Sequence, residues 1–190
     1  LASDVEILDV YEGTGTRVFP SRLVGINLTQ DMVSYYTMNG SGEIDRLILK
    51  DVTGDNYSYG LLTRLDEMPT GTMTNYYTYV YDVGGTTYTL PNITTRFPVS
   101  TGGVMIKGDL SNPEKIYNLT KVSADRISGN QLIASNRSYT MADNVVIYEY
   151  RNGSYYLSSA ERVQEKGLTL TGWYDKAESS GGRIRLVVAK

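Results

Sequence analysis

The feature that most constrains this chain is a strand–turn–strand pattern that first occurs at residues 30–50, QDMVSYYTMNGSGEIDRLILK. Both arms are rich in residues that favour extended backbone, and the turn at residues 39–42 consists of Asn, Ser and two Gly. The same plan returns at residues 103–122 and at residues 168–190. Such segments are expected to form antiparallel hairpins, which need a second sheet or a closed barrel to cover their apolar face.

Two further segments have the composition of hairpins. Residues 76–90 surround a Gly-Gly pair and residues 148–157 surround an Asn-Gly pair, and both pairs suit the positive φ angles of two-residue turns. A helical turn is expected only at residues 158–167, where Ser159 is a candidate N-cap. We therefore predict an all-β fold of repeated antiparallel β-hairpin units that form small barrels or a β-sandwich, with at most one short helix.

The best candidate for a domain boundary is the stretch RLDEMPTG at residues 64–71, which Pro and Gly punctuate. We expect residues 1–71 to form a first β-unit and residues 72–190 to form a second and a third, or all of them to make one continuous all-β domain. No signal peptide precedes Leu1, so we expect a mature form or a piece of a longer protein.

The recurring hairpin predicts an internal repeat. A gapless comparison offsets the first and second copies by 72 residues, and the second and third by 68. The positions that recur are apolar: Ile44, Ile116 and Ile184 form one set, and Leu47, Leu119 and Val187 form the other. Three diverged copies of a unit of about 70 residues explain this spacing. Chance is the alternative, because any two exposed hairpins share alternating apolar residues and a glycine.

The composition excludes several kinds of chemistry. The chain has neither Cys nor His, so disulfides, thiol catalysis, Cys-type zinc sites and a Ser-His-Asp triad are all excluded. A net charge of -3 without a basic stripe argues against nucleic acid as a partner. No apolar run approaches the roughly 18 residues of a membrane helix, so no membrane span is expected in this chain. We predict no cofactor.

Tyrosine is unusually frequent, with 17 Tyr against two Phe and one Trp. Tyr has an apolar body and a polar tip, so it suits the half-buried surface of a thin sheet. A second interpretation is stacking against sugar rings or a partner protein. The candidate ligand-binding residues are then Trp173, Tyr174, Tyr155 and Tyr156, if their strands are neighbours. The simpler interpretation of the lone Trp is an anchor for a core or a sheet edge.

The most distinctive local segment is DVTGDNYSYG at residues 51–60. Its oxygen-bearing side chains make Asp51 and Asp55 candidate ligands for a hard cation such as Ca²⁺. The EF-hand spacing fails, because Thr53 and Leu62 stand where that loop needs ligands. The alternative is a turn in which Asp side chains accept hydrogen bonds from backbone N–H groups.

Paired carboxylates are the remaining catalytic candidates. Glu149 is the candidate for a glycosidase carboxylate pair, with either Asp175 or Glu178 as its partner, and nothing in the spacing singles these residues out. We therefore expect a protein that is not an enzyme.

The segment DVTGDNYSYG, with the flanking GEIDRLIL and the terminal GGRIRLVVAK, resembles β-rich regions of bacterial cell-surface proteins that carry S-layer homology domains. The resemblance covers mainly residues 30–65 and 100–190 and lies outside the S-layer homology domains themselves. The helices of those domains are absent from this sequence, so their wall-anchoring activity is not carried over.

The resemblance implies an extracellular module of the cell envelope. It leads us to expect a non-catalytic structural, spacer or adhesion unit of a bacterial surface protein. The alternative is a module that binds carbohydrate or a wall polymer through surface Tyr and Trp. The expected partners are cell-wall polysaccharide or other surface proteins.

Overall fold

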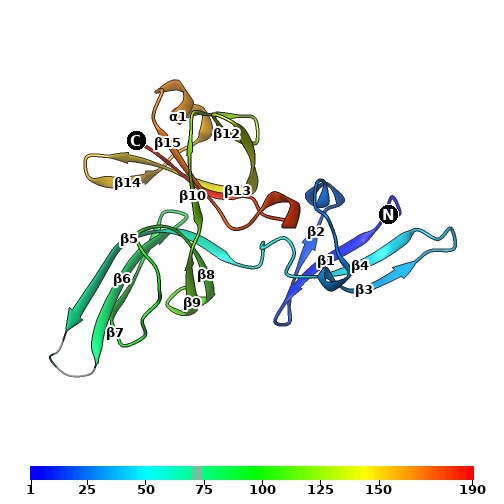
Figure 1. Cartoon of the computed structure of the whole chain (residues 1–190), viewed down its shortest axis with the longest axis horizontal. Coiled ribbons are helices and arrows are strands. Elements are labelled where there is room, and N and C mark those ends of the chain that lie inside the picture. The colour runs from blue at the N-terminus through cyan, green and yellow to red at the C-terminus, as the bar shows by residue number, and fades with distance from the viewer. Residues whose placement is uncertain (70, 72–73) are drawn as a thin grey trace. The chain divides into compact units, whose positions relative to one another are not determined.

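The computed structural model describes residues 1–69, 71 and 74–190. Strands predominate in this part of the chain, and its one α-helix is six residues long, which confirms the predicted all-β fold (Figure 1). Contacts divide the chain into two compact units. The first unit is Leu1–Asn56 with Lys176–Gly182, and the second is Tyr57–Asp175 with Arg183–Lys190.

The first unit contains a four-stranded sheet in the order β2-β1-β4-β3. Its elements are β1 (Glu6–Tyr11), β2 (Thr14–Val18), the 3-10 helices η1 (Pro20–Leu23) and η2 (Gln30–Met32), β3 (Val33–Met38) and β4 (Ile44–Lys50). β3 and β4 pair antiparallel around the Asn-Gly-Ser-Gly turn, as residues 30–50 predicted. β1 pairs antiparallel with β2 but parallel with β4, so a parallel seam runs through the centre of the sheet.

One face of this sheet carries the core of the first unit. Ile7, Leu47 and Leu49 alternate with exposed or half-buried neighbours and pack with Val18. The segment Lys176–Gly182, which includes η3 (Glu178–Ser180), belongs to the same unit. Gly181 has φ +93°, and a Cβ there would lie 2.1 Å from the carbonyl oxygen of Val52, so only glycine fits.

The second unit contains two sheets. The five-stranded sheet has the order β7-β6-β5-β8-β9 and is antiparallel throughout. Its strands are β5 (Ser58–Pro69), β6 (Asn75–Val83), β7 (Thr86–Ile93), β8 (Gly102–Asp109) and β9 (Asn112–Asn118). The predicted hairpin of residues 76–90 is confirmed, with Gly84 and Gly85 at φ +59° and +88° in its turn.

The other sheet has seven strands in the order β10-β15-β16-β13-β12-β11, with β14 also paired to β13. Its elements are β10 (Thr120–Ala124), β11 (Arg126–Ser128), β12 (Gln131–Ala134), β13 (Arg137–Arg151), β14 (Ser154–Leu157), α1 (Ala160–Glu165), β15 (Leu170–Tyr174) and β16 (Ile184–Ala189). The Asn-Gly hairpin of residues 148–157 is confirmed. So is the short helix, because Ser159 caps α1 and its hydroxyl accepts from the amide of Arg162.

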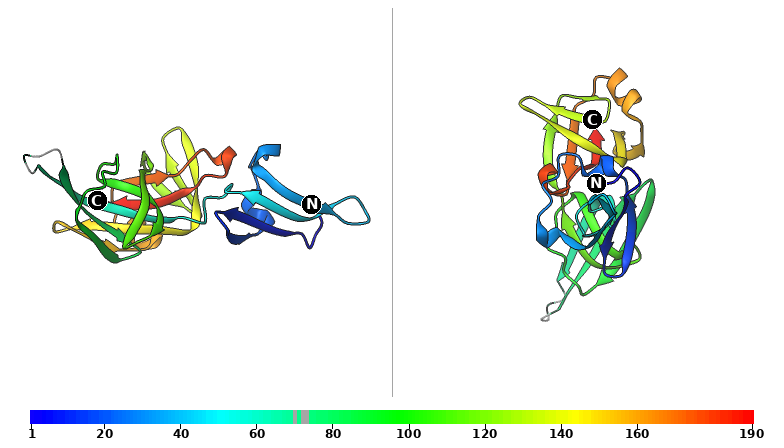
Figure 2. Two further views of the ribbon diagram at one scale, coloured as in Figure 1. Left: turned by 90° about the horizontal axis from the view of Figure 1, so that it is seen from below. Right: turned by 90° about the vertical axis from the view of Figure 1, so that its right-hand side faces the viewer.

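The two sheets of the second unit pack against each other through one apolar cluster. Tyr59 and Leu61 of β5 meet Leu186 of β16 and the indole of Trp173. Gly103 of β8 lies directly against that indole, and a Cβ there would stand 2.4 Å from the ring. Figure 2 shows the C-terminal strand β16 (red) inside this unit. The second unit is therefore a layered β-structure with the lone Trp in its interior.

The structure contains one four-strand motif twice. The order β2-β1-β4-β3 of the first unit recurs in the second as β14-β13-β16-β15. The first three of these strands are displaced by 140 residues, and β15 is displaced from β3 by 136. The parallel seams agree residue for residue: Ile7 pairs with Leu47 and Asp9 with Leu49, while Ile147 pairs with Val187 and Glu149 with Ala189. A bulge falls at the same place in each motif, at Asp45 and at Arg185.

This repeat agrees with part of the sequence comparison. Ile44 and Ile184, which that comparison aligned, begin the equivalent strands β4 and β16. The intervening copy, residues 103–122, forms the β8–β9 hairpin at the edge of the five-stranded sheet and has no parallel seam. Of the three copies in the sequence comparison, the first and the third therefore occupy equivalent places in the four-strand motif.

Residues 64–69 of the candidate boundary stretch belong to β5 and pair with β6 inside the second unit. Thr70, Thr72 and Met73 lie outside the described residues. The two compact units divide between Asn56 and Tyr57, at the end of the DVTGDN segment.

Candidate functional site

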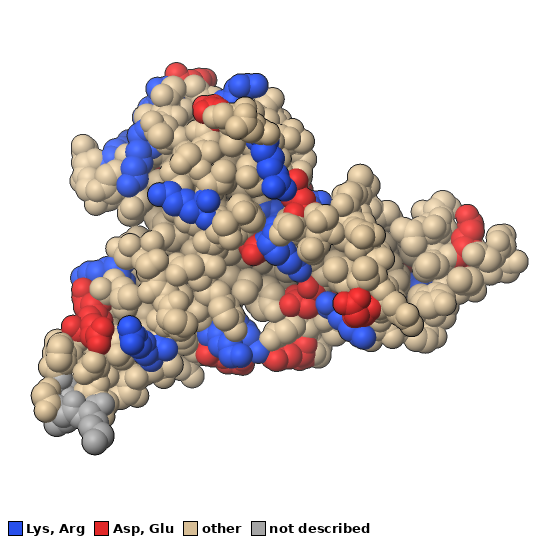
Figure 3. Space-filling view, in the orientation of Figure 1, with Lys and Arg blue, Asp and Glu red and all other residues tan. Residues whose placement is uncertain are grey.

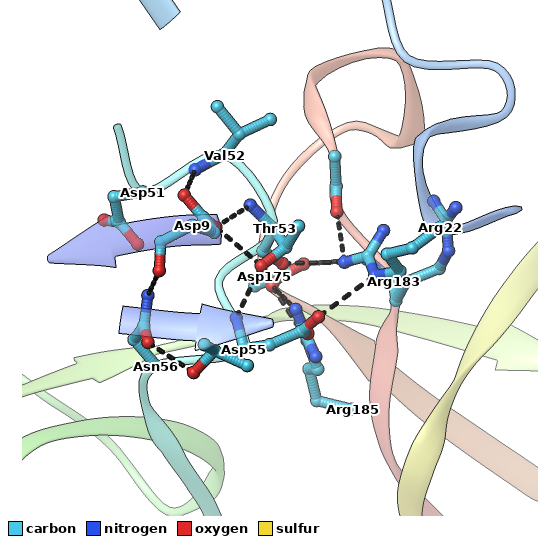
Figure 4. Close-up of polar contacts among 12 residues, drawn as sticks. Asp9, Arg22, Asp51, Val52, Thr53, Asp55, Asn56, Asp175, Arg183 and Arg185 are labelled. Carbon is cyan, nitrogen blue, oxygen red and sulfur yellow. Dashed lines mark hydrogen bonds and ion pairs between the residues drawn. The ribbon is translucent and has the colours of Figure 1, made fainter. Parts of the chain in front are cut away.

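The centre of the first unit's polar chemistry is Asp9, an acid on the core-facing side of β1. Its carboxylate is fully buried and accepts three hydrogen bonds from the loop that follows β4. The amides of Val52 and Thr53 donate at 2.9 and 2.6 Å, and the hydroxyl of Thr53 donates at 2.6 Å (Figure 4). Donors of this number offset much of the cost of burying the charge.

Further hydrogen bonds connect the same loop to β1 and β2. Asn56 donates through Nδ2 to the backbone carbonyl of Asp9 at 3.2 Å, and Thr16 donates to Asn56 Oδ1 at 2.7 Å. The hydroxyl of Thr53 also accepts from the amide of Asp55 at 3.2 Å. The DVTGDN segment is thus an ordered turn in which a carboxylate accepts backbone N–H groups. The carboxylate that holds it belongs to Asp9, which the sequence reasoning missed.

A signal for Asp9 was present in the sequence. Asp9 has the same parity as Ile7 along the strand VEILDV, so a core-facing Ile7 implies a core-facing acid. An acid in that position needs donors, and the sequence alone does not say where they are.

Arg22 of η1 binds three parts of the first unit together. Its Nε lies 3.2 Å from Asp55 Oδ2, and its Nη2 donates at 2.7 Å to the carbonyl oxygens of Thr53 and Gly181. Lys176 donates to the carbonyl of Asp51 at 3.1 Å. Residues 51–56 and the segment Lys176–Gly182 are therefore held by cationic side chains.

Asp51 and Asp55, the two predicted ligands of a cation, both lie in this loop. Asp55 forms an ion pair with Arg22, and Asp51 turns the chain at φ +52°. Within the described part of the chain, no three Asp, Glu, His or Cys side chains gather closely enough to hold a metal ion. A cation bound by Asp51 and Asp55 stays a prediction.

The second unit has a buried ion pair of its own. Arg185 lies 2.8 Å through Nη2 and 2.9 Å through Nε from Asp175 Oδ2. Asp175 also accepts from the hydroxyl of Tyr59 at 3.2 Å and from the amide of Arg183 at 2.9 Å. The guanidinium of Arg185 sits 4.6 Å from the centre of the Tyr59 ring. These contacts join β5, β15 and β16.

Glu149 is the counterpart of Asp9 in the second four-strand motif, and it is also buried. Its partners differ: Arg162 of α1 lies 2.7 Å and Lys166 lies 2.5 Å from its carboxylate oxygens. Hydrogen bonds from Lys166 and Arg162 lower the pKa of Glu149 from 4.5 to about 2. Glu149 is therefore deprotonated at neutral pH, a state that does not suit the proton-donating member of a glycosidase carboxylate pair.

The four aromatic residues that the sequence grouped do not share one surface. β15 carries Trp173 and Tyr174, β14 carries Tyr155 and Tyr156, and β16 and β13 lie between these strands. Trp173 is only 9% exposed and faces the five-stranded sheet, with Tyr155 on the same side. Tyr174 packs against the core on the opposite side. Of the four, Tyr156 is the most accessible, at 43%.

A different aromatic hollow lies on the five-stranded sheet, and the sequence reasoning did not anticipate it. It has a volume of about 480 Å³ and is lined by Tyr77, Tyr79 and Phe97, with Glu67 and Arg96 at its polar wall. The hydroxyl of Tyr79 accepts from the amide of Phe97 at 2.8 Å, which fixes the ring. Tyr77, Tyr79 and Phe97 are at most 8% exposed and belong to the core beneath the hollow, so the exposed Glu67 and Arg96 are its accessible polar groups.

The surface carries both signs of charge. Figure 3 shows Lys and Arg interspersed with Asp and Glu on the face in view. Among residues 1–69, 71 and 74–190, no helix has the length and hydropathy needed to cross a membrane. Comparisons with models of known protein families, with curated proteins and with solved structures find no match for this chain.

Proposed function

We propose that this chain is a non-catalytic structural or spacer module, or an adhesion module, of an extracellular bacterial cell-envelope protein. The observation that carries the proposal is the four-strand motif, which is used twice with the same register. Repetition of one unit is typical of architectural modules, because each copy is selected for packing. A catalytic site, in contrast, requires particular residues at one place.

The acids of the core support this proposal by what they bind. Asp9 holds a loop, Asp175 holds Arg185 at the bulge of β16, and Glu149 holds α1. Each carboxylate therefore links two separate segments of the chain. The envelope location rests on the resemblance to bacterial surface proteins and agrees with a chain that has no Cys.

Surface labelling tests this proposal. An antibody against the chain is expected to label intact cells of the organism that makes it, and external trypsin is expected to remove the label. A cytoplasmic protein serves as the control and should be detected only after permeabilisation. Label that appears only in permeabilised cells would contradict an envelope location, and release of reducing sugar from purified cell walls would contradict a non-catalytic role.

The alternative function is binding of carbohydrate or a wall polymer. The hollow beside Tyr77 favours it, because the exposed Glu67 and Arg96 on its wall can hydrogen-bond to sugar hydroxyls. Co-sedimentation with purified cell walls separates the two functions. If the hollow binds, Glu67→Gln and Arg96→Ala should weaken co-sedimentation, while the exposed Tyr156→Ala on β14 should not.

A further inference from the structure

The first unit has one sheet face that its own core does not cover. The face opposite the core carries a row of side chains across all four strands, and a second, charged row lies beside it. The rows are Arg17, Leu8, Ile48 and Tyr35, followed by Glu6, Arg46 and Thr37. We call this surface the open face. All of these residues except Thr37 line a hollow of about 410 Å³.

The open face is more apolar than a solvated sheet face needs to be. Leu8 is 42% exposed and Tyr35 is 54% exposed, and they flank the half-buried Ile48. The side chains that face water on such a sheet are normally polar. Neighbouring apolar side chains of this size on a monomer commonly mark an interaction surface.

The second four-strand motif shows what covers this face. Tyr148 and Val188 stand at the positions of Leu8 and Ile48, and they are only 1% and 2% exposed. They are covered by the five-stranded sheet, through Tyr59 and by a hydrogen bond from Tyr148 to Asp82. The same surface, in the same register, is thus a sheet-packing interface in the second unit.

The pattern of side chains on the open face is self-complementary. Glu6 on β1 lies beside Arg46 on β4, at 3.6 Å, and Leu8 on β1 lies beside Ile48 on β4. Consider a two-fold axis parallel to the strands and centred on the β1–β4 seam. It would place each residue of a pair opposite its neighbour in a second copy: Glu6 opposite Arg46, and Leu8 opposite Ile48.

The ends of the apolar row also match under this symmetry. Arg17 on β2 would face Tyr35 on β3 of the second copy, a pairing of guanidinium with an aromatic ring. Within its own chain, Arg17 already lies 5.6 Å from the ring centre of Phe19, so it is oriented beside aromatic surface. Two sheets packed in this way have nearly aligned strands, which is the usual sandwich arrangement.

We propose that the open face binds the open face of a second copy of this chain, forming a two-fold sheet-on-sheet dimer. The proposal does not depend on the function proposed above. In this dimer the second copy covers the open face, just as the five-stranded sheet covers the equivalent face of the second motif. Because each charged pair crosses the interface twice, a single reversal of charge acts twice in the dimer.

Charge reversal in the full chain tests the proposal. Sedimentation velocity from about 1 µM to about 1 mM should show a concentration-dependent dimer. Glu6→Lys places Lys against Arg46 in both contacts, and Arg46→Glu places Glu against Glu6. Each variant alone should raise the dissociation constant about tenfold or more. An equimolar mixture of the two variants should associate again, because every crossing pair is then attractive.

Two controls separate the interface from general effects of charge and folding. Arg64→Glu alters an exposed ion pair with Asp66, at 2.9 Å in the second unit, and should leave the dimer unchanged. Leu8→Asp should abolish the dimer while circular dichroism stays the same. A chain that remains monomeric throughout, a dimer insensitive to Leu8→Asp, or a mixture that does not recover would each overturn the proposal.

Discussion

The two copies of the four-strand motif bury an acid at the same position and satisfy it in different ways. Asp9 accepts from backbone amides and a hydroxyl of the loop that follows β4. Glu149 accepts from Arg162 and Lys166, whose side chains are 47% and 40% exposed. Both motifs therefore bury a carboxylate at this seam, and the segment that packs beside the seam supplies its donors: the loop after β4 in the first unit and α1 with Lys166 in the second.

The bulge that β4 and β16 share is the second difference between the motifs, and it has the largest expected effect on the unfolding free energy. It holds Arg185 in the second motif and Asp45 in the first. Asp175→Ala leaves the buried guanidinium of Arg185 without that carboxylate, so we expect unfolding of the second unit to become easier by about 3–5 kcal/mol. Because two units can unfold separately, hydrogen exchange should accompany urea denaturation.

The matched change at the other bulge is Asp45→Ala. Asp45 is half-buried and accepts from the hydroxyl of Thr37 at 2.5 Å, so its loss should be worth about 1 kcal/mol or less. Equal destabilisation by the two substitutions would show that the bulge, and not the burial of Arg185, sets the energy.

Asp9→Ala is expected to have the next largest effect. Three buried donors lose their acceptor, so the first unit should lose about 2–4 kcal/mol of unfolding free energy. The measurement is hydrogen exchange at the amides of Val52 and Thr53. Asp9→Asn keeps one acceptor oxygen and should lie between Ala and the unaltered chain. Unchanged protection of these two amides in Asp9→Ala would refute the role assigned to Asp9.

Glu149→Gln should destabilise the second unit less than Asp9→Ala destabilises the first. Its cationic partners reach water, where they are solvated and screened. The effect should shrink between about 0.1 M and about 1 M NaCl, whereas that of Asp9→Ala should not. Urea midpoints at the two salt concentrations check this, and a salt-independent Glu149→Gln effect would contradict it.

The smallest expected effect is a change of the unfolding free energy with pH, which arises from Glu149. The pKa of Glu149 is lowered from 4.5 to about 2 in the folded chain, so folding favours its deprotonated form. Its stabilisation is therefore complete above pH 4.5 and is lost as the pH falls towards 2. The difference in unfolding free energy between the unaltered chain and Glu149→Gln should narrow over this interval. A constant difference would place the charge interaction elsewhere.

Much of the local structure was readable because turns are encoded by a few adjacent residues. Asn152 has φ +51° and is followed by Gly153 at +82°, as an Asn-Gly hairpin requires. Ser159 capped its helix for the same local reason. The grouping of Trp173 with Tyr155 and Tyr156 depended on strand order, and in the sheet two strands lie between theirs.

By itself, the sequence determined the all-β class and the hairpins around residues 39–42, 84–85 and 152–153, since their turns are encoded by residues next to one another. Only the tertiary structure decided that β1 lies parallel to β4, that Asp9 meets residues 52 and 53, and that Arg185 meets Asp175 beneath Tyr59. Alternation assigns a face to each strand but does not identify its neighbours. The partners of a buried charge are therefore set by packing between distant segments.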